Sequence, residues 1–380
     1  MVGTRGVPAR YGGFETAVEE IGTRLAARGH EVIVYCRSHG DDASAPGVHN
    51  GMILVHLPAL RRKSLETLSH TACCALHSLR SRRCDVTIVF NAANSVFLPV
   101  FRVRSTGVAT HVDGLEWKRS KWGTIGKRYY RLAEGLATRW SDALICDAEG
   151  IAEYYRDEFG VDGDVIAYGA PILHDVGDAL LVGLALERRR YHLIVARFEP
   201  ENHVVLGIEG YRKSRAQYPL VVVGAAPYSD AYTRRIHDLV AGDRRVRLVG
   251  AVWDQALLDQ LYVNAASYVH GHSVGGTNPS LLRAMGAGSP IAAFDVNFNR
   301  EVLGESGQFW ATARELAAAI DDVEEHPATS RLRGEGARAR ASARYQWDSV
   351  AVEYEQLCSR LARKEATTAQ TLSFREILRR

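Results

Sequence analysis

Residues 270–290 read HGHSVGGTNPSLLRAMGAGSP, a polar, glycine-rich loop that follows the apolar stretch SYVH (267–270) and leads directly into a short helix. The loop residues that leave the backbone open to a ligand, or offer polar side chains, are Ser273, Gly275, Gly276, Thr277 and Asn278. Unpaired N–H groups at the start of a helix, together with the helix dipole, favour an anion such as phosphate or diphosphate. We therefore predict an anion site where this loop meets the helix that Pro279 and Ser280 open.

The rest of the chain repeats this order of strand and helix, which is typical of βαβ units and parallel sheets. In the first half, the predicted strands are residues 31–36, 52–57, 85–90, 107–111, 143–147 and 164–168. In the second half, they are residues 191–196, 219–224, 245–250, 267–270 and 290–294. Two separate series predict an α/β protein with two Rossmann-like domains.

The alternation of strands and helices breaks after the predicted strand 164–168. Residues 169–190, which follow it, read GAPILHDVGDALLVGLALERRR. We place the hinge there, so that the predicted domains span residues 1–170 and 171–344. Residues 345–363 show the spacing of one amphipathic helix, which we expect to pack back on the first domain. The polar and basic residues 364–380 are expected to form a loose tail.

The first helix is predicted to begin at Gly12 and Gly13, because apolar residues then recur on one face: Phe14, Val18, Ile21 and Leu25. A helix at this place normally follows a strand. Only Met1 and Val2 precede the loop GTRGVPARYGG, so we expect the opening strand to be shortened.

Composition narrows the class of protein. The 380 residues carry 47 Lys and Arg against 44 Asp and Glu, and a net charge of +3 gives no case for a nucleic-acid partner. The cysteines show neither a C-x-x-C pair nor the His spacing of a zinc site. No apolar run approaches the roughly 20 residues of a membrane span, and no N-terminal signal segment is present. We therefore expect a cytoplasmic protein.

Four motifs, in this order, resemble the rhamnosyltransferase-like branch of the family 4 glycosyltransferases. They are GTRGVPARYGGFET (3–16), HVDGLEWKRSKW (111–122), ARFEPEN (196–202) and HGHSVGGTNPSLL (270–282). The resemblance implies the GT-B fold, in which two Rossmann-like domains face a central cleft. It also implies a retaining transfer of a sugar from a nucleotide-diphospho sugar to a saccharide or lipid-linked acceptor, in polysaccharide biosynthesis. Neither a metal nor another cofactor is expected.

In the first domain, Asp113 follows the predicted strand GVATH and is expected at the carboxyl end of that strand, where open α/β sheets bind ligands. The alternative is that Asp113 caps the turn before Gly114. By resemblance, this loop holds a catalytic acid or histidine near the transferred sugar, with Asp113 as first candidate and His111 as second. The amides of Gly12 and Gly13 are expected to bind the donor or to form a plain tight turn.

In the second domain, Arg197 closes a predicted strand, where its guanidinium is expected to bind a diphosphate bidentately and to stabilise the departing charge. Many GT-B enzymes pair this arginine with a lysine five positions later, and Asn202 stands at that position here. We expect His203 or His272 to supply the missing positive charge.

By resemblance, the loop that follows binds the donor through His272, Gly275, Gly276, Thr277, Asn278 and Ser280. The alternative is an ordinary loop at a helix start, capped by Thr277 and Asn278.

The same loop departs from the family at two positions. Family 4 enzymes commonly carry two glutamates separated by seven residues, and these positions are Gly275 and Arg283 here. Arginine has no acceptor for a ribose hydroxyl proton, and one lost hydrogen bond to a charged group costs about 1.5–3 kcal/mol. Arg283 is therefore expected to bind donor phosphate, or the chain is a non-catalytic nucleotide-sugar-binding homologue. A nucleotide-sugar 2-epimerase is a further alternative, disfavoured because the glutamates are missing.

The stretch WKRSKWGTIGKRYYR (117–131) combines basic and aromatic side chains. Such a set is suited to an anionic membrane surface or a lipid diphosphate, so we expect peripheral contact between the first domain and a membrane. The alternative is a solvated helix face above buried aromatic rings.

Overall fold

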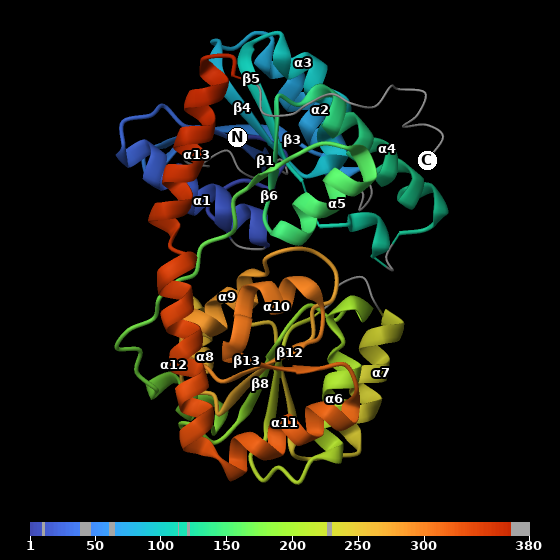
Figure 1. Ribbon diagram of the computed structural model, residues 1–380, viewed down its shortest axis with the longest axis vertical. Helices are drawn as coiled ribbons and strands as arrows, with labels where there is room; N and C mark the ends of the chain where they lie inside the picture. The colour runs from blue at the N-terminus through green and yellow to red at the C-terminus, as the bar shows by residue number, and fades with distance from the viewer. Residues whose placement is uncertain are drawn as a thin grey trace. The chain divides into compact units, whose positions relative to one another are not determined.

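The computed structural model describes residues 1–9, 12–38, 47–60, 65–112, 114–119, 122–225 and 230–365. Asp113 and most of the predicted tail therefore lie outside the described residues. The chain divides into two compact units, one formed by Met1–Tyr168 with Trp347–Arg380 and the other by Gly169–Gln346. Each unit is an α/β fold with a parallel sheet at its centre (Figure 1).

The first unit contains two sheets. Parallel strands with the order β4-β5-β6-β7 form one, and β1-β3-β2, in which β2 pairs antiparallel to β3, forms the other. The strands are β1 (Ile33–Ser38), β2 (Val48–His49), β3 (Met52–Pro58), β4 (Cys84–Phe90), β5 (Ser105–His111), β6 (Ala143–Cys146) and β7 (Asp164–Val165). The helices are α1 (Gly13–Ala27), α2 (Glu66–Ser78), η1 (Ala92–Phe97), α3 (Leu98–Arg102), η2 (Glu116–Lys118), α4 (Thr124–Trp140), α5 (Glu149–Phe159) and α13 (Trp347–Ala362).

The two N-terminal residues lie between these sheets. Val2 forms a single parallel bridge with Val89 of β4, and the N–H of Tyr35 in β1 donates to the carbonyl of Met1 at 3.1 Å. The opening strand is thus reduced to one bridge, which still connects the hydrogen bonding of β1 with that of β4.

Helix α13 packs against α1 within this unit (Figure 1). Arg24 pairs with Asp348 at 2.7 Å and Arg28 with Glu355 at 2.6 Å. Its apolar face includes Tyr354, which is 1% exposed. Helix α13 is thereby held in the first unit by both charge pairs and apolar burial.

The second unit contains one sheet of six parallel strands with the order β10-β9-β8-β11-β12-β13. The strands are β8 (His192–Val195), β9 (Leu220–Val223), β10 (Val246–Gly250), β11 (Ser267–His270), β12 (Ile291–Phe294) and β13 (Gly307–Trp310). The helices are η3 (Ala179–Leu184), η4 (Pro200–Asn202), α6 (Val204–Lys213), α7 (Asp230–Ala241), α8 (Gln255–Val263), α9 (Pro279–Gly286), α10 (Asn297–Leu303), η5 (Gly304–Ser306), α11 (Ala313–Glu325) and α12 (Pro327–Arg344).

This sheet reads 3-2-1-4-5-6 when its strands are counted along the unit, which is the doubly wound Rossmann order. Helices cover both faces, so the inner strands are mostly apolar, as the fully buried Leu220–Val223 shows. The predicted strand regions all recur, although β7 is shorter than residues 164–168. The short strands β2 and β13 were not predicted, because neither carries an apolar run long enough to stand out.

Candidate functional site

The strand order of the second unit places two of the sequence motifs side by side. The strand order reverses between β8 and β11, which are neighbours although two strands separate them in the chain. Ligands of open α/β sheets bind beyond the carboxyl ends of the strands at such a reversal. ARFEPEN follows β8 and HGHSVGG follows β11, so both motifs lie at this point.

Side chains and backbone groups join these two motifs into one structure. The Asn202 amide donates to the Arg197 carbonyl at 2.8 Å, which leaves its oxygen to accept from His272 Nδ1 at 2.7 Å. Ser273 donates both its N–H and its hydroxyl to the Glu201 carbonyl, each at 3.0 Å. Asn202, which replaces a lysine of related enzymes, therefore fixes the orientation of the His272 ring.

The close approach of these segments explains the glycine at position 271. A Cβ atom added to Gly271 would lie 2.2 Å from the Asn202 carbonyl oxygen, so no larger residue fits. His203 Nδ1 donates to the Gly271 carbonyl at 2.8 Å, and its ring stacks on Phe294 with centroids 4.1 Å apart. His203 therefore ties the loop to the end of β12 through these two contacts.

Arg197 is half-buried at the carboxyl edge of the sheet. Within the described part of the chain, its guanidinium forms no ion pair and donates no hydrogen bond. The Arg197 guanidinium, a permanently charged group with five N–H donors, is thus available beside the two hydrogen-bonded motifs.

The backbone of the glycine-rich loop offers further donors. Gly275 has φ of 134°, a backbone conformation suited to glycine. Among the described residues, no acceptor lies within hydrogen-bonding geometry of the Gly275 and Gly276 N–H groups. Neighbouring free backbone N–H groups are a recurrent feature of anion-binding loops.

The start of α9 differs from the prediction. Asn278 caps this helix, and its side-chain oxygen accepts from the N–H groups of Ser280 at 2.9 Å and Leu281 at 3.4 Å. Because Pro279 has no N–H, the first turn keeps few free donors. Among the described loop residues, the glycine amides thus remain free donors, and the capping role weighed for Asn278 is present in the structure.

Arg283 lies on α9 and pairs with Asp259 of α8, and the two side chains are 20% and 19% exposed. Asp259 also accepts from Gln255 at 2.9 Å. The cation at the unusual position is therefore neutralised by a carboxylate from the neighbouring helix.

In the first unit, the start of α1 lies at the carboxyl edge of the sheet. Gly12 precedes the helix with φ of 104°, and Phe14 contacts Phe90 of β4 and His111 of β5 with ring centroids 5.6 and 5.1 Å away. Glu15 accepts from the Arg5 N–H at 2.9 Å. Burial raises the pKa of Glu15, against the effect of that hydrogen bond.

His111 ends β5 and is fully buried among aromatic rings: Phe14, Phe90, Tyr168 and Tyr354. Its Nδ1 lies 3.1 Å from the Tyr354 hydroxyl, and its Nε2 has no hydrogen-bond partner in the described part of the chain. Burial lowers the pKa of His111 to about 3, so the ring is neutral at physiological pH. Gly12, Gly13 and His111 are thus neighbours, whereas Asp113 is outside the described residues.

The basic and aromatic stretch divides into a packed part and an exposed part. Arg131 stacks on Trp117 at 5.2 Å and pairs with Glu158, and Trp117 Nε1 donates to the Tyr154 hydroxyl at 3.2 Å. The Tyr154 hydroxyl donates in turn to the buried Glu134 at 2.8 Å. Burial raises the pKa of Glu134 to about 7.

The exposed part is the first turn of α4. Ile125 is 85% exposed, and Lys127 and Arg128 are exposed beside it. Across the residues that the structure describes, no helix is long and apolar enough to cross a membrane, and no group of three or more His, Cys, Asp or Glu side chains is arranged to hold a metal ion.

Sequence comparisons assign different families to the two parts of the chain. Residues 189–326 match the family described as Glycosyl transferases group 1. Residues 1–171 match a domain of unknown function, DUF1972. The range matched by the glycosyltransferase family, residues 189–326, contains every site residue described above in the second unit.

Solved structures show the fold of the whole chain. Sucrose-phosphate synthase from Thermosynechococcus elongatus is similar with a TM-score of 0.78 and 22% identity over 96% of each chain. HepE of Anabaena in complex with UDP is similar with a TM-score of 0.72 and 16% identity over 93% of this chain and 98% of that chain. The predicted GT-B fold is confirmed.

A curated relative matches a smaller part. The GtfA subunit of the UDP-N-acetylglucosamine–peptide N-acetylglucosaminyltransferase of Streptococcus gordonii is 29% identical over 125 residues, which is 32% of this chain. The match spans only 24% of that relative's own length.

Two features of the site were not predicted from the sequence. The ion pair between Asp259 and Arg283 was not predicted. The two residues are 24 positions apart in the sequence, and the packing of α8 on α9 brings them together. His270 was not selected either, although it ends β11, and burial lowers its pKa to about 3. Its place at the end of a strand before a polar loop was the available signal.

Proposed function

We propose that this protein transfers a sugar, with retention, from a nucleotide-diphospho sugar to a saccharide or lipid-linked acceptor in polysaccharide biosynthesis. The observation that carries this proposal is the joined pair of motifs at the strand-order reversal of the second unit. There, Arg197, with its free guanidinium, belongs to the motif 196–202. Hydrogen bonds join this motif to the loop that carries the Gly275 and Gly276 amides. The four sequence motifs support assignment to the rhamnosyltransferase-like branch of family 4.

In the proposed reaction, the bond between the anomeric carbon and the diphosphate oxygen breaks, and the acceptor oxygen forms the new bond to that carbon. The proton of the acceptor hydroxyl leaves with the nucleoside diphosphate. Arg197 and the loop amides stabilise the negative charge that develops on the leaving group. Stabilisation of this kind, together with positioning, supplies the catalysis without a nucleophile from the protein.

The residues of the first unit have a different proposed role. Neutral His111 offers a hydrogen-bonding nitrogen in an aromatic surrounding, and the start of α1 offers the amides of Gly12 and Gly13. We assign these groups to the transferred sugar and the acceptor, together with Asp113. No metal enters this scheme, so turnover is expected to survive dialysis against EDTA.

The experiment is calorimetric titration of the full chain with UDP-glucose, UDP-N-acetylglucosamine and a deoxythymidine-diphospho sugar, followed by mass analysis of products with saccharide acceptors. Uridine donors come first, because HepE of Anabaena was solved with UDP and with UDP-glucose. Binding of one donor and a glycosylated product support the proposal. The absence of binding by every donor contradicts it.

The non-catalytic alternative is favoured by the neutralised Arg283. It predicts donor binding without any glycosylated product or free sugar. The epimerase alternative predicts conversion of the donor sugar without an acceptor, which the same product analysis detects.

We also propose a peripheral membrane contact through the first turn of α4, because Ile125 and its basic neighbours are exposed there. Flotation with phosphatidylglycerol vesicles tests this contact. Ile125→Ser combined with Lys127→Gln is expected to reduce the bound fraction severalfold, and an unchanged fraction contradicts the proposal.

A further inference from the structure

The amino edge of the second sheet, opposite the proposed donor site, carries a group of arginines that we call the arginine cluster: Arg188, Arg189, Arg331 and Arg338. Strand β8 is four residues long, or about 13 Å at 3.3 Å per residue. The two edges are therefore separate places on the same unit.

Neighbouring strand starts bring these residues together. The Arg189 N–H donates to the Asn264 carbonyl at 2.8 Å, and its guanidinium donates to the Ala265 carbonyl at 3.0 Å, so it lies at the start of β11. The adjacent strand β12 begins after Gly288. A Cβ atom added to Gly288 would lie 3.7 Å from Cδ, Nε and Cζ of Arg338, so that side chain lies flat over this turn.

Helix α12 presents the other arginine on the same face. Arg331 and Arg338 are seven residues apart, which is about two helical turns or 10 Å. The close approach of α12 is fixed at Gly334, where an added Cβ would lie 2.3 Å from the Gly288 carbonyl oxygen. These contacts thus place the Arg189 guanidinium beside the start of β11 and the Arg338 side chain beside the turn before β12, while Arg188 adjoins Arg189 in sequence and Arg331 lies on the same helix as Arg338.

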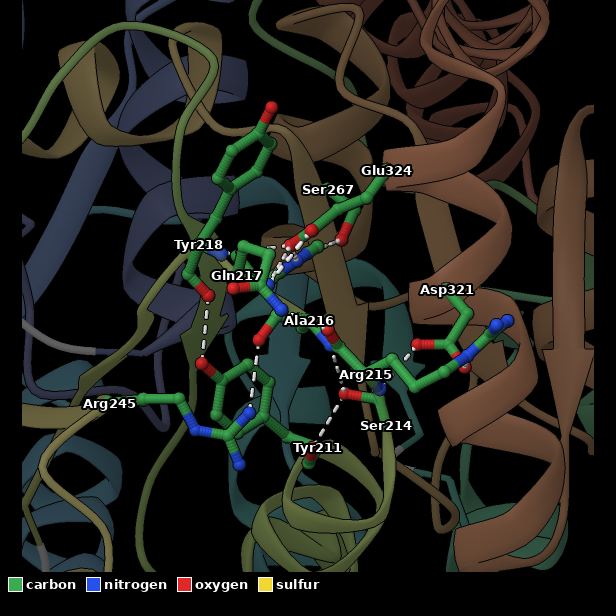
Figure 2. Close-up of polar contacts among 11 residues, drawn as sticks. Tyr211, Ser214, Arg215, Ala216, Gln217, Tyr218, Arg245, Ser267, Asp321 and Glu324 are labelled. Atoms are coloured by element: carbon green, nitrogen blue, oxygen red, sulfur yellow. Dashed lines mark hydrogen bonds and ion pairs between the residues drawn. The ribbon is translucent and has the colours of Figure 1, made fainter.

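Other arginines at this edge are paired with carboxylates. Figure 2 shows Arg245 and Arg215 among the hydrogen bonds around Glu324 and Asp321. Arg245 pairs with Asp243 at 2.8 Å, and Arg215 with Glu325 at 2.6 Å. Glu324 accepts from the N–H groups of Gln217 and Tyr218 at 2.9 and 3.0 Å, so its charge is used within this network.

The cluster has less compensation from carboxylates. Within the described residues, Arg188 and Arg338 form no ion pair, and Arg189 bonds only to a carbonyl. Arg331 has one distant partner, Glu335 at 3.9 Å, and both side chains are exposed. Burial and the charges of Arg188, Arg331 and Arg338 together lower the pKa of Arg189.

The backbone at Arg189 adds a second observation. Its φ is 61°, in the left-handed region that costs a non-glycine residue about 1–2 kcal/mol. Strain of this kind persists where the surrounding structure maintains it and is concentrated at ligand sites. At this position the Arg189 guanidinium donates to the Ala265 carbonyl at 3.0 Å.

We propose that the arginine cluster is a binding site for a phosphate-type oxyanion, distinct from the donor site. Guanidinium groups bind phosphate bidentately, and a tetrahedral anion with several oxygens can accept from more than one of them at once. A carboxylate has only two oxygens, so it can accept hydrogen bonds from fewer of the guanidinium groups than a phosphate can. The ligand is a free phosphate ester or ion, or the phosphate of a lipid headgroup.

The test uses the full chain in phosphate-free buffer and two matched double variants. Arg188→Gln with Arg338→Gln removes two cluster charges and leaves the Arg189 bond to Ala265 in place. Arg234→Gln with Arg235→Gln removes two charges from exposed positions of α7 and serves as the control. Circular dichroism and thermal midpoints without phosphate establish that each variant folds.

Inorganic phosphate is titrated by calorimetry against each protein. The proposal predicts binding at least about tenfold weaker in the Arg188/Arg338 variant and unchanged in the control, since each charged contact contributes a factor of about ten or more. Arg197→Gln separates the two sites, because it is expected to leave this binding intact. Equal affinity in all variants, or binding lost with Arg197→Gln alone, overturns the proposal.

Vesicles of phosphatidylglycerol, compared with phosphatidylcholine, distinguish the source of the phosphate. Loss of vesicle flotation in the Arg188/Arg338 variant assigns the site to a lipid headgroup, and loss of inorganic phosphate binding alone assigns it to a free anion. If the Arg188/Arg338 variant matches the wild type in both measurements, the site does not exist. Where that variant fails to fold, Arg338→Lys replaces it, with weaker phosphate binding expected and equal binding contradictory.

Discussion

In the second unit, the carboxyl edge of the sheet is polar: Asn202 holds His272, Ser273 holds the Glu201 carbonyl, and Arg197 keeps a free charge. In the first unit, the corresponding edge is aromatic, and rings surround a neutral His111. Both edges follow from the same βα architecture. The side chains placed there differ, and so does the chemistry each edge supports.

The difference separates two tasks of a proposed transferase. A diphosphate carries charge before and after the reaction, so its site needs fixed donors and a cation that does not titrate. A sugar is neutral, and a dry aromatic surface with one hydrogen-bonding nitrogen suits it without a charge to desolvate.

The largest effect is expected for Arg197→Gln. Removing the free guanidinium takes away the cation that stabilises the leaving diphosphate, so kcat/KM with the donor should fall about 100- to 1000-fold. Steady-state kinetics with the donor found by calorimetry measure this loss. Arg234→Gln on α7 is the matched control, and an equal loss there would show that general charge, rather than the site, is responsible.

Asn202→Ala should have the next largest effect. The change removes the acceptor of His272 Nδ1 and the donor to the Arg197 carbonyl. Each of these two groups then lacks a hydrogen-bond partner, and a buried group left unpaired costs about 1–3 kcal/mol. We expect donor affinity to fall at least about tenfold and the thermal midpoint to fall with it. Asn202→Asp keeps the acceptor, so it should recover part of the affinity; no recovery would contradict the role given to that oxygen.

His111→Phe tests the neutral edge through pH. Because the folded pKa of His111, about 3, lies below the ordinary value of 6.5, its contribution to stability is complete above pH 6.5 and is lost as pH falls toward 3. Each such group contributes a slope of about 1.4 kcal/mol per pH unit in this window. The variant should therefore show a smaller drop in thermal midpoint between pH 7 and pH 5.

His111→Phe has a matched control in His326→Phe, since His326 lies exposed at the end of α11. This control should keep the acid sensitivity of the wild type. An unchanged drop in the His111 variant would mean that the buried ring is protonated in the folded protein.

The smallest effect is expected for the Arg283–Asp259 pair. Arg283→Glu breaks a partly exposed ion pair and sets two carboxylates together, at a cost of about 0.5–1 kcal/mol in unfolding free energy. Asp259→Arg combined with Arg283→Glu should restore that stability. If Arg283→Glu instead tightens donor binding, a ribose contact is missing in the wild type and the non-catalytic alternative gains support.

The sequence predicted the architecture well because a parallel sheet leaves an apolar run at each buried strand, as in Leu220–Val223. It also placed Arg197 and the 270–282 loop together, since both follow strands. The sequence did not show which residues of this loop cap the helix and which keep free N–H groups. In the structure, Asn278 caps the helix and the Gly275 and Gly276 amides are free, but small polar residues and glycines are typical of both roles. The partners of Arg283 and His111 depend on packing between distant segments, Asp259 in one case and Tyr354 in the other.

Hydrogen exchange of the Gly275 and Gly276 amides with and without UDP tests the central claim most directly. These N–H groups have no acceptor in the described part of the chain, so they should exchange rapidly in the protein alone. UDP should slow their exchange at least about tenfold. The amides of Ser280 and Leu281 should change little, because the Asn278 side chain already accepts hydrogen bonds from them. Saturating UDP without protection at Gly275 and Gly276 would contradict the diphosphate site.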